Sequence, residues 1–181
     1  GCLNTEEGVI LLDKLINHFR KTLLKKTNVI KNTKIININN IRGELSSKKN
    51  SFDGYDFIIN STYQNPNLGL KRKKFINKYE LTAMVKIKKP FADQKGITIM
   101  DGPFCSIYPQ DRKYSTISSV KYTPVLKFKS FRNIEKKMKS INKKKIIKNI
   151  IDHARKYFKL PKNLGKKEII LSYKVKTKND K

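Results

Sequence analysis

The hydrophobic positions near the start of the chain follow a helical period. Between residues 9 and 25, apolar side chains recur at spacings of three and four, which predicts an amphipathic helix with one apolar stripe. The stripe comprises Leu12, Leu15, Ile16, Phe19 and Leu23. A short strand is expected next, over residues 34–41, where Ile36 and Ile38 share one face.

Two segments that follow have opposite characters. Residues 43–51 are rich in Ser, Lys and Asn and predict a polar loop. Residues 55–60 hold the continuous apolar run Phe57, Ile58 and Ile59, which is typical of a short strand buried on both faces.

The middle of the chain changes to a period of two. Apolar residues alternate with more polar ones through Tyr79, Leu81, Ala83, Val85 and Ile87, which predicts a strand with one covered face. Short turns then separate further apolar segments up to residue 122. Because short connections join antiparallel neighbours, residues 79–122 are expected to form a meander of about four strands.

Beyond Pro124 the helical period returns. Phe128, Phe131, Glu135, Met138 and Ile141 predict one amphipathic helical segment, and residues 147–158 predict a second that ends before Pro161. The alternating residues 168–176 predict a closing strand. The expected class is α+β, an antiparallel meander packed with helices.

The composition adds a strong positive charge. The 181 residues carry a formal net charge of +28, from 42 Lys and Arg against 14 Asp and Glu. This charge invites a nucleic-acid or anionic-membrane interpretation, and nonspecific binding to polyanions is expected at low salt. However, only six of the cations are Arg, and an A- and T-rich genome would also enrich Lys, Asn and Ile. Base-reading proteins favour Arg, so a basic nucleic-acid-binding protein stays as the alternative.

The titratable residues that bind metals are scarce and scattered. Cys2 and Cys105 form no C-x-x-C pair, and His18 and His153 each stand alone in a helical pattern, so no metal site is expected. We expect Cys105 to be an inert thiol buried in a strand, and both histidines to be exposed or half-buried. No apolar run is long enough to span a bilayer and no secretory signal can be read in these residues, so a soluble cytoplasmic protein is expected.

Three stretches, in order, carry a resemblance to a known family. The sequence TEEGVI at residues 5–10 precedes the first helix, and YDFIINSTY at residues 55–63 is similar to a "D-x-V-I-N-A-T/C" strand. The most specific stretch is GITIMDGPF at residues 96–104, followed by Tyr108-Pro109 and by SSVKYTP at residues 118–124. Together they resemble the FAD-dependent oxidoreductases of the D-amino-acid-oxidase superfamily.

The resemblance implies a division of the chain. Residues 1–63 would hold partial flavin-lobe elements, residues 64–125 the antiparallel substrate-domain sheet, and residues 126–181 the helices and closing strand of the same domain. No G-x-G-x-x-G motif is present, so the dinucleotide-binding segment would be missing from this chain. We therefore expect FAD as the cofactor by resemblance, bound only weakly by this chain alone, and an isolated chain that is inactive.

The resemblance also implies a site. The chain would be part of an enzyme that oxidises a CH–NH or CH–OH group of a small-molecule substrate, completed by the missing flavin-binding segment of the same protein. Substrate-binding candidates are Tyr108, Arg112 and Tyr122; cofactor-binding candidates are Asn60, Ser61 and Thr62. The apolar face of residues 79–87 would pack under a helix, and the opposite face would look toward the flavin lobe. A lysine-rich interaction module without catalysis stays open as a further alternative.

Overall fold

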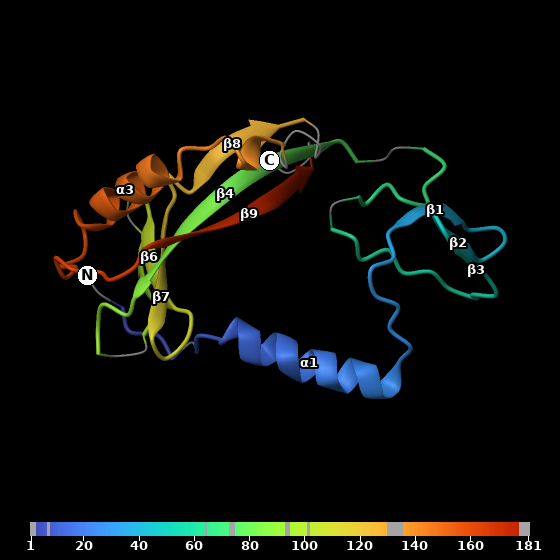
Figure 1. The fold of residues 1–181 in the computed structure, drawn as a ribbon, viewed down its shortest axis with the longest axis horizontal. Helices are drawn as coiled ribbons and strands as arrows, with labels where there is room; N and C mark the ends of the chain where they lie inside the picture. The colour runs from blue at the N-terminus through green and yellow to red at the C-terminus, as the bar shows by residue number, and fades with distance from the viewer. Residues whose placement is uncertain are drawn as a thin grey trace. The chain divides into compact units, whose positions relative to one another are not determined.

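The computed structural model describes residues 3–6, 8–63, 65–72, 75–92, 95–100, 102–129 and 136–177 (Figure 1). Helices and antiparallel sheets are both present, so the expected α+β class is confirmed. The chain divides into two compact units. The first comprises residues 1–21 and 79–174, and the second comprises residues 22–78 and 175–181. The segment 1–63 therefore contributes to both units.

The first unit contains the larger sheet, and its strands run mostly in sequence order. The sheet order is β5-β6-β7-β4-β8, with β9 also paired to β4, and each described pair is antiparallel. Strands β5, β6 and β7 follow one another as a meander, but β4 pairs with β7 rather than with β5, so the predicted four-strand meander is correct only for these three strands. The strands are β4 (Asn77–Lys88), β5 (Ile97–Ile99), β6 (Cys105–Pro109), β7 (Tyr114–Ser119), β8 (Pro124–Phe128) and β9 (Glu168–Thr177).

Strand β8 corrects one prediction. Helix was expected beyond Pro124, but β8 pairs with the first part of β4 and places Phe128 opposite Tyr79. Strand β7 pairs with the second part of the same strand, where Val85 lies opposite Ile117. Of the predicted helical segment, residues 131–135 lie outside the described residues, and residues 136–138 are helical.

Helix α3 (Lys143–Ala154) covers one face of this sheet (Figure 1). It begins at Asn142, whose side-chain oxygen accepts a hydrogen bond from the backbone N–H of Lys145 at 3.0 Å. Its apolar stripe packs on the alternating apolar residues of the strands. The period of two along β4 predicted this covered face. The shared core includes Ala83, Val85, Ile87, Cys105, Ile107, Ile117, Ile150, Ile151 and Ala154.

The second unit contains a smaller sheet of three antiparallel strands, β1 (Ile35–Asn39), β2 (Glu44–Ser47) and β3 (Ser51–Phe52). Strand β1 was predicted, but the segment 43–51 that was expected to be a polar loop supplies β2 and the start of β3. The predicted strand over residues 55–60 is wrong, because these residues form no strand, and Phe57 is 89% exposed.

Helix α1 (Leu12–Lys26) confirms the first predicted element. Asp13 lies in its first turn and Lys25 and Lys26 in its last, which suits the helix dipole. None of its residues is buried. Within the described part of the chain, no helix has the length and apolar character required to cross a bilayer.

Candidate functional site on the open sheet face

The face of the larger sheet that α3 does not cover carries hydroxyl groups in place of a second core. Because side chains alternate along a strand, the neighbours of the core residues point to this side. The register aligns Lys86 with Thr116 and Thr116 with Tyr108, so the three strands β4, β7 and β6 share it. We call this surface the open face; it comprises Thr82, Met84, Lys86, Thr98, Ser106, Tyr108, Tyr114, Thr116 and Ser118.

A chain of hydrogen-bonded hydroxyls crosses the edge of the open face. The hydroxyl of Thr98 on β5 donates to Ser106 Oγ at 3.1 Å, and the phenolic oxygen of Tyr108 lies 2.8 Å from the same Thr98 Oγ1. A threonine hydroxyl has one proton, so Tyr108 is the donor in the second bond. The phenolic oxygen of Tyr108 thus keeps its lone pairs available to a ligand.

Gly96 sets the position of the Tyr108 ring. A Cβ atom at residue 96 would lie 2.6 Å from two carbons of this ring and 3.1 Å from Val9 Cγ2. No real side chain tolerates the first distance, so the ring lies across the backbone of residue 96 only because that residue is glycine. The side chain of Tyr108 is 43% exposed, which leaves its other side accessible.

The end of the open face near the β6–β7 turn is charged. The carboxylate of Asp111 accepts hydrogen bonds from the backbone N–H groups of Lys113 at 2.7 Å and Tyr114 at 2.8 Å. These bonds, and then the nearby charges of Lys86 and Lys113, lower the pKa of Asp111. The ammonium of Lys86 lies 4.3 Å from the centroid of the Tyr114 ring, a cation–π arrangement.

The structure separates the three predicted substrate-binding residues. Tyr108 lies on the open face, and Arg112 is exposed in the turn that joins β6 to β7. Tyr122 lies in the turn after β7, beyond the opposite end of that strand, and packs against the core under α3. Only Tyr108 therefore stands on the face that a flavin lobe was expected to adjoin.

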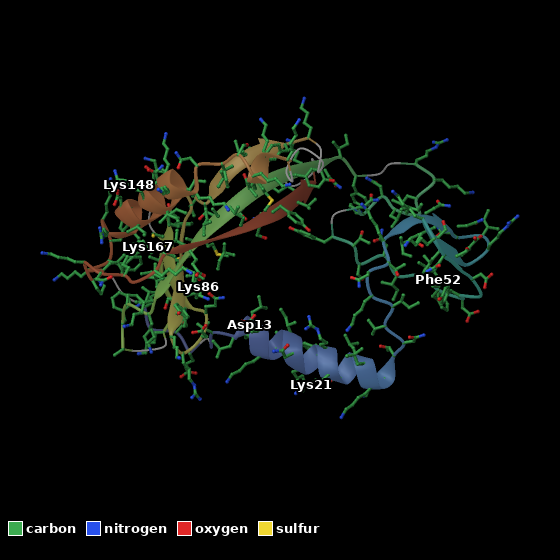
Figure 2. The ribbon with its side chains drawn as sticks, in the orientation of Figure 1. Asp13, Lys21, Phe52, Lys86, Lys148 and Lys167 are labelled. Atoms are coloured by element: carbon green, nitrogen blue, oxygen red, sulfur yellow. The ribbon has the colours of Figure 1, made fainter. Side chains whose placement is uncertain are left out.

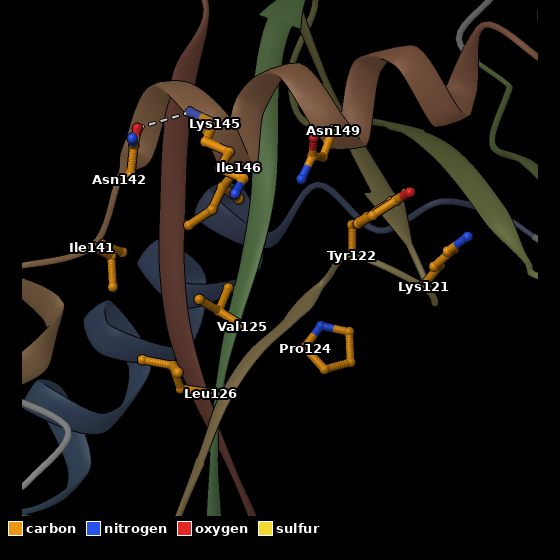
Figure 3. Close-up of a pocket in the computed structure, with 10 residues that line it drawn as sticks. All are labelled: Lys121, Tyr122, Pro124, Val125, Leu126, Ile141, Asn142, Lys145, Ile146 and Asn149. Atoms are coloured by element: carbon orange, nitrogen blue, oxygen red, sulfur yellow. Dashed lines mark hydrogen bonds between the residues drawn. The ribbon is translucent and has the colours of Figure 1, made fainter.

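Tyr122 lines a shallow cavity on the helix-covered side, between β8 and the start of α3 (Figure 3). The cavity has a volume of about 330 Å³. Its floor is apolar and its rim carries Lys121, Asn142, Lys145 and Asn149. Because Asn142 already caps α3, its side-chain oxygen is used within the fold.

The predicted cofactor-binding residues lie in the second unit and organise a turn. The amide of Asn60 donates to the backbone oxygens of Asn65 at 3.0 Å and Leu68 at 3.1 Å. Its side-chain oxygen accepts from the backbone N–H of Thr62 at 3.0 Å and from the Thr62 hydroxyl at 2.7 Å. Ser61 is exposed between them. These bonds are local, so the side chains of Asn60 and Thr62 stabilise the backbone conformation of this turn.

A buried polar pair was missed from the sequence. His153 on α3 was expected to be exposed or half-buried, but it is 4% exposed, and its Nδ1 lies 2.9 Å from the hydroxyl oxygen of the fully buried Ser119. Burial, and then the charges of Lys156 and Lys121, lower the pKa of His153. Its position three residues after Ile150, on the apolar stripe of α3, was the available signal.

The remaining candidate groups for chemistry are inert or dispersed. Cys105 is buried as predicted, its Sγ donates to the backbone oxygen of Ser118 at 3.2 Å, and burial raises its pKa to about 11. Cys2 lies outside the described residues. Among the residues that the structure describes, no three or more His, Cys, Asp or Glu side chains are grouped so as to hold a metal ion.

Comparisons of the chain with protein-family models, with curated proteins and with solved structures found no match.

Proposed function

We propose that this chain is the substrate-domain portion of an FAD-dependent oxidoreductase that oxidises a CH–NH or CH–OH substrate, with the open face as a wall of the substrate site. The observation that carries the proposal is the asymmetry of the sheet: one face is closed by α3, and the other presents hydrogen-bonded hydroxyls. A polar second face is common in antiparallel sheets, and what distinguishes this one is the hydrogen-bonded chain of the Thr98, Ser106 and Tyr108 hydroxyls.

The most specific of the sequence motifs coincide with strands of the larger sheet, which supports the same proposal. The stretch at residues 96–104 covers β5 and leads into β6, and the stretch at residues 118–124 joins β7 to β8. The motifs at residues 96–104 and 118–124 thus lie in strands of the larger sheet and their connections, whereas the motif at residues 55–63 forms no strand. One of them contains Gly96, whose missing side chain allows the Tyr108 ring its position.

The residues of this chain do not fit the nucleotide half of FAD. A pyrophosphate is usually held by a glycine-rich turn at a helix N-terminus, and the sequence contains no G-x-G-x-x-G. Gly43, Gly54 and Gly69 have positive φ angles but are at least eleven positions apart. We propose that a segment outside these 181 residues holds the nucleotide.

In this proposal, the open face orients the substrate and shields it from water. A bound flavin ring would accept the hydride from the substrate carbon. The phenolic oxygen of Tyr108, with its proton directed to Thr98, would accept a hydrogen bond from a substrate amine or hydroxyl. Because the strands under these residues share a packed core with α3, the acceptor is held in place before the substrate binds.

The proposal is tested on the complete polypeptide that contains this chain. The encoding DNA is read on both sides for an in-frame G-x-G-x-x-G segment, and the whole protein is purified. We expect a yellow protein whose flavin absorbance is bleached, without oxygen, by an amino acid, an N-methylated amine or a 2-hydroxy acid. A complete protein with neither the motif nor bound flavin would contradict the proposal.

A pair of matched variants tests the open face. Removing the phenolic oxygen in Tyr108→Phe is expected to slow flavin reduction by roughly tenfold or more, the range reported for a lost positioning contact. Tyr122→Phe makes the same chemical change on the helix-covered side and is expected to leave the rate within about twofold. Equal rates for the two variants would show that the substrate does not contact the open face.

The charge supports a second candidate function. Lys86 and Tyr114 stack on the open face, and the exposed Tyr108 lies on the same surface, a combination that single-strand nucleic-acid binders use. If nucleic acid is bound only through the net charge of +28, affinity falls steeply as salt is raised. Sub-micromolar binding to one preferred sequence at roughly 0.2 M salt would favour this function over oxidation.

A further inference from the structure

Helix α1 carries an apolar stripe whose side chains are mostly exposed, with Leu15 half-buried. Leu12 is 63% exposed, Ile16 43%, Phe19 54% and Leu23 51%. These residues recur at spacings of three and four, so they lie on one side of the helix. A helix of a compact unit normally buries such a stripe against a core, whereas none of the residues of α1 is buried.

The rest of α1 is basic. The helix contains five cations, Lys14, Arg20, Lys21, Lys25 and Lys26, against the single acid Asp13 (Figure 2 labels Asp13 and Lys21). At about 100° per residue, Lys14, Lys21 and Lys25 fall on the side opposite the stripe, while Arg20 and Lys26 flank it. Positions that border the stripe allow long side chains to reach outward from an apolar surface.

We propose that α1 is an interfacial helix that binds the surface of an anionic membrane, with its apolar stripe among the acyl chains and its cations against the lipid headgroups. Apolar residues on one face, Lys and Arg on the other and a low overall hydrophobicity are the features of helices that lie in the membrane plane. The charge of the whole chain adds to the attraction, because its net value of +28 complements a negative leaflet.

The charge favours a membrane over a second copy of the chain. Two copies of α1 packed along their stripes would bring Arg20 and Lys26 of one helix near the same cations of the other, with only Asp13 to offset them. An anionic bilayer instead buries the apolar stripe among its acyl chains and neutralises the flanking cations with its headgroups. The proposal does not depend on the oxidoreductase function.

The absence of tryptophan from the chain provides a direct test. Phe19→Trp places one fluorophore on the stripe, and Lys21→Trp places one about 200° around the helix. Each full-length variant is mixed with vesicles of phosphatidylcholine alone or with added phosphatidylserine. We expect the anionic vesicles to shift the emission of Trp at residue 19 to the blue and to protect it from acrylamide, with little change at residue 21.

Two outcomes would overturn the proposal. Emission at residue 19 that is already blue-shifted without vesicles would mean that another part of the chain or a second copy covers the stripe. Equal responses at residues 19 and 21 would mean that the protein binds vesicles only through its charge.

A second pair of variants tests the energetics with matched charge. Phe19→Asp is expected to weaken sedimentation with anionic vesicles at least about tenfold, the factor expected when one aromatic side chain no longer inserts. Phe57→Asp adds the same charge at a residue that is 89% exposed in the second unit, and is expected to change binding by less than about twofold. Equal effects of the two substitutions would contradict insertion of the stripe.

Discussion

The buried contact between Ser119 and His153 gives a sharp prediction about stability. Ser119 is fully buried on β7, and its hydroxyl oxygen lies 2.9 Å from His153 Nδ1. In Ser119→Ala, this ring nitrogen stays in the core without its partner. The backbone N–H of Tyr122, which lies 3.3 Å from the same hydroxyl, keeps its bond to the Ser119 backbone oxygen at 3.0 Å.

The cost therefore comes mainly from one unsatisfied imidazole nitrogen. A buried polar group that loses its only partner typically costs about 1–3 kcal/mol, and we expect Ser119→Ala to lower the free energy of unfolding by that amount. The cavity left by one hydroxyl oxygen is small, so a larger loss is not expected.

Urea unfolding followed by far-ultraviolet circular dichroism at pH 8 measures this loss, since His153 is neutral there. The matched control is Ser118→Ala, the adjacent residue on β7, whose side chain points to the open face. That substitution is expected to change stability by no more than about 0.5 kcal/mol. If the two variants lose the same stability, the Ser119–His153 contact does not stabilise the fold.

Three further predictions concern other parts of the first unit. Because the pKa of His153 is lowered in the folded state, the unfolded chain binds the proton first as the pH falls. The free energy of unfolding should therefore decrease below about pH 6.5, by at most about 1.4 kcal/mol per pH unit. Urea unfolding of His153→Gln between pH 7 and 5 should lack this decrease. Gly96→Ala should lower the free energy of unfolding by about 1–3 kcal/mol in the same assay, because its Cβ would collide with the Tyr108 ring. Gly8→Ala is the control and should leave the free energy of unfolding unchanged, because no atom lies within 4 Å of the added carbon. The thiol of Cys105, buried and with a pKa of about 11, should react with a chromogenic disulfide at pH 8 only after urea unfolds the chain; rapid reaction of this thiol in the native state would contradict its burial.

The long periodic elements were predictable from the sequence. Helices α1 and α3 and strands β4 and β9 each repeat their pattern over ten or more residues, enough for one period to be distinguished from the other. Segment 55–60 differs from these elements, because its apolar residues form no strand. An apolar run becomes a strand only when another strand pairs with it, and here Phe57 and Ile59 are 89% and 87% exposed.

The candidate site was predictable only in part. The alternation along β4 predicted a covered and an open face, and this division exists. It did not fix the position of Tyr122, because the turn at residues 119–123 places that residue under α3, where its ring centroid lies 5.5 Å from that of His153, a contact between segments far apart in the sequence. The burial of His153 was missed because a histidine on an apolar stripe is buried only where a hydrogen-bond partner lies beside it. The sequence does not show that Ser119 lies there.

The position of β4 in the larger sheet has a consequence for how the chain acquires its structure during synthesis. Strand β9 pairs with β4, and Thr82 donates a side-chain hydrogen bond to the backbone oxygen of Ser172, 90 residues later. Since a ribosome adds about 5–20 residues per second, β4 emerges roughly 4–18 s before β9 is complete. During that interval one edge of a twelve-residue strand has no partner, which exposes the nascent chain to pairing with its neighbours on the same message.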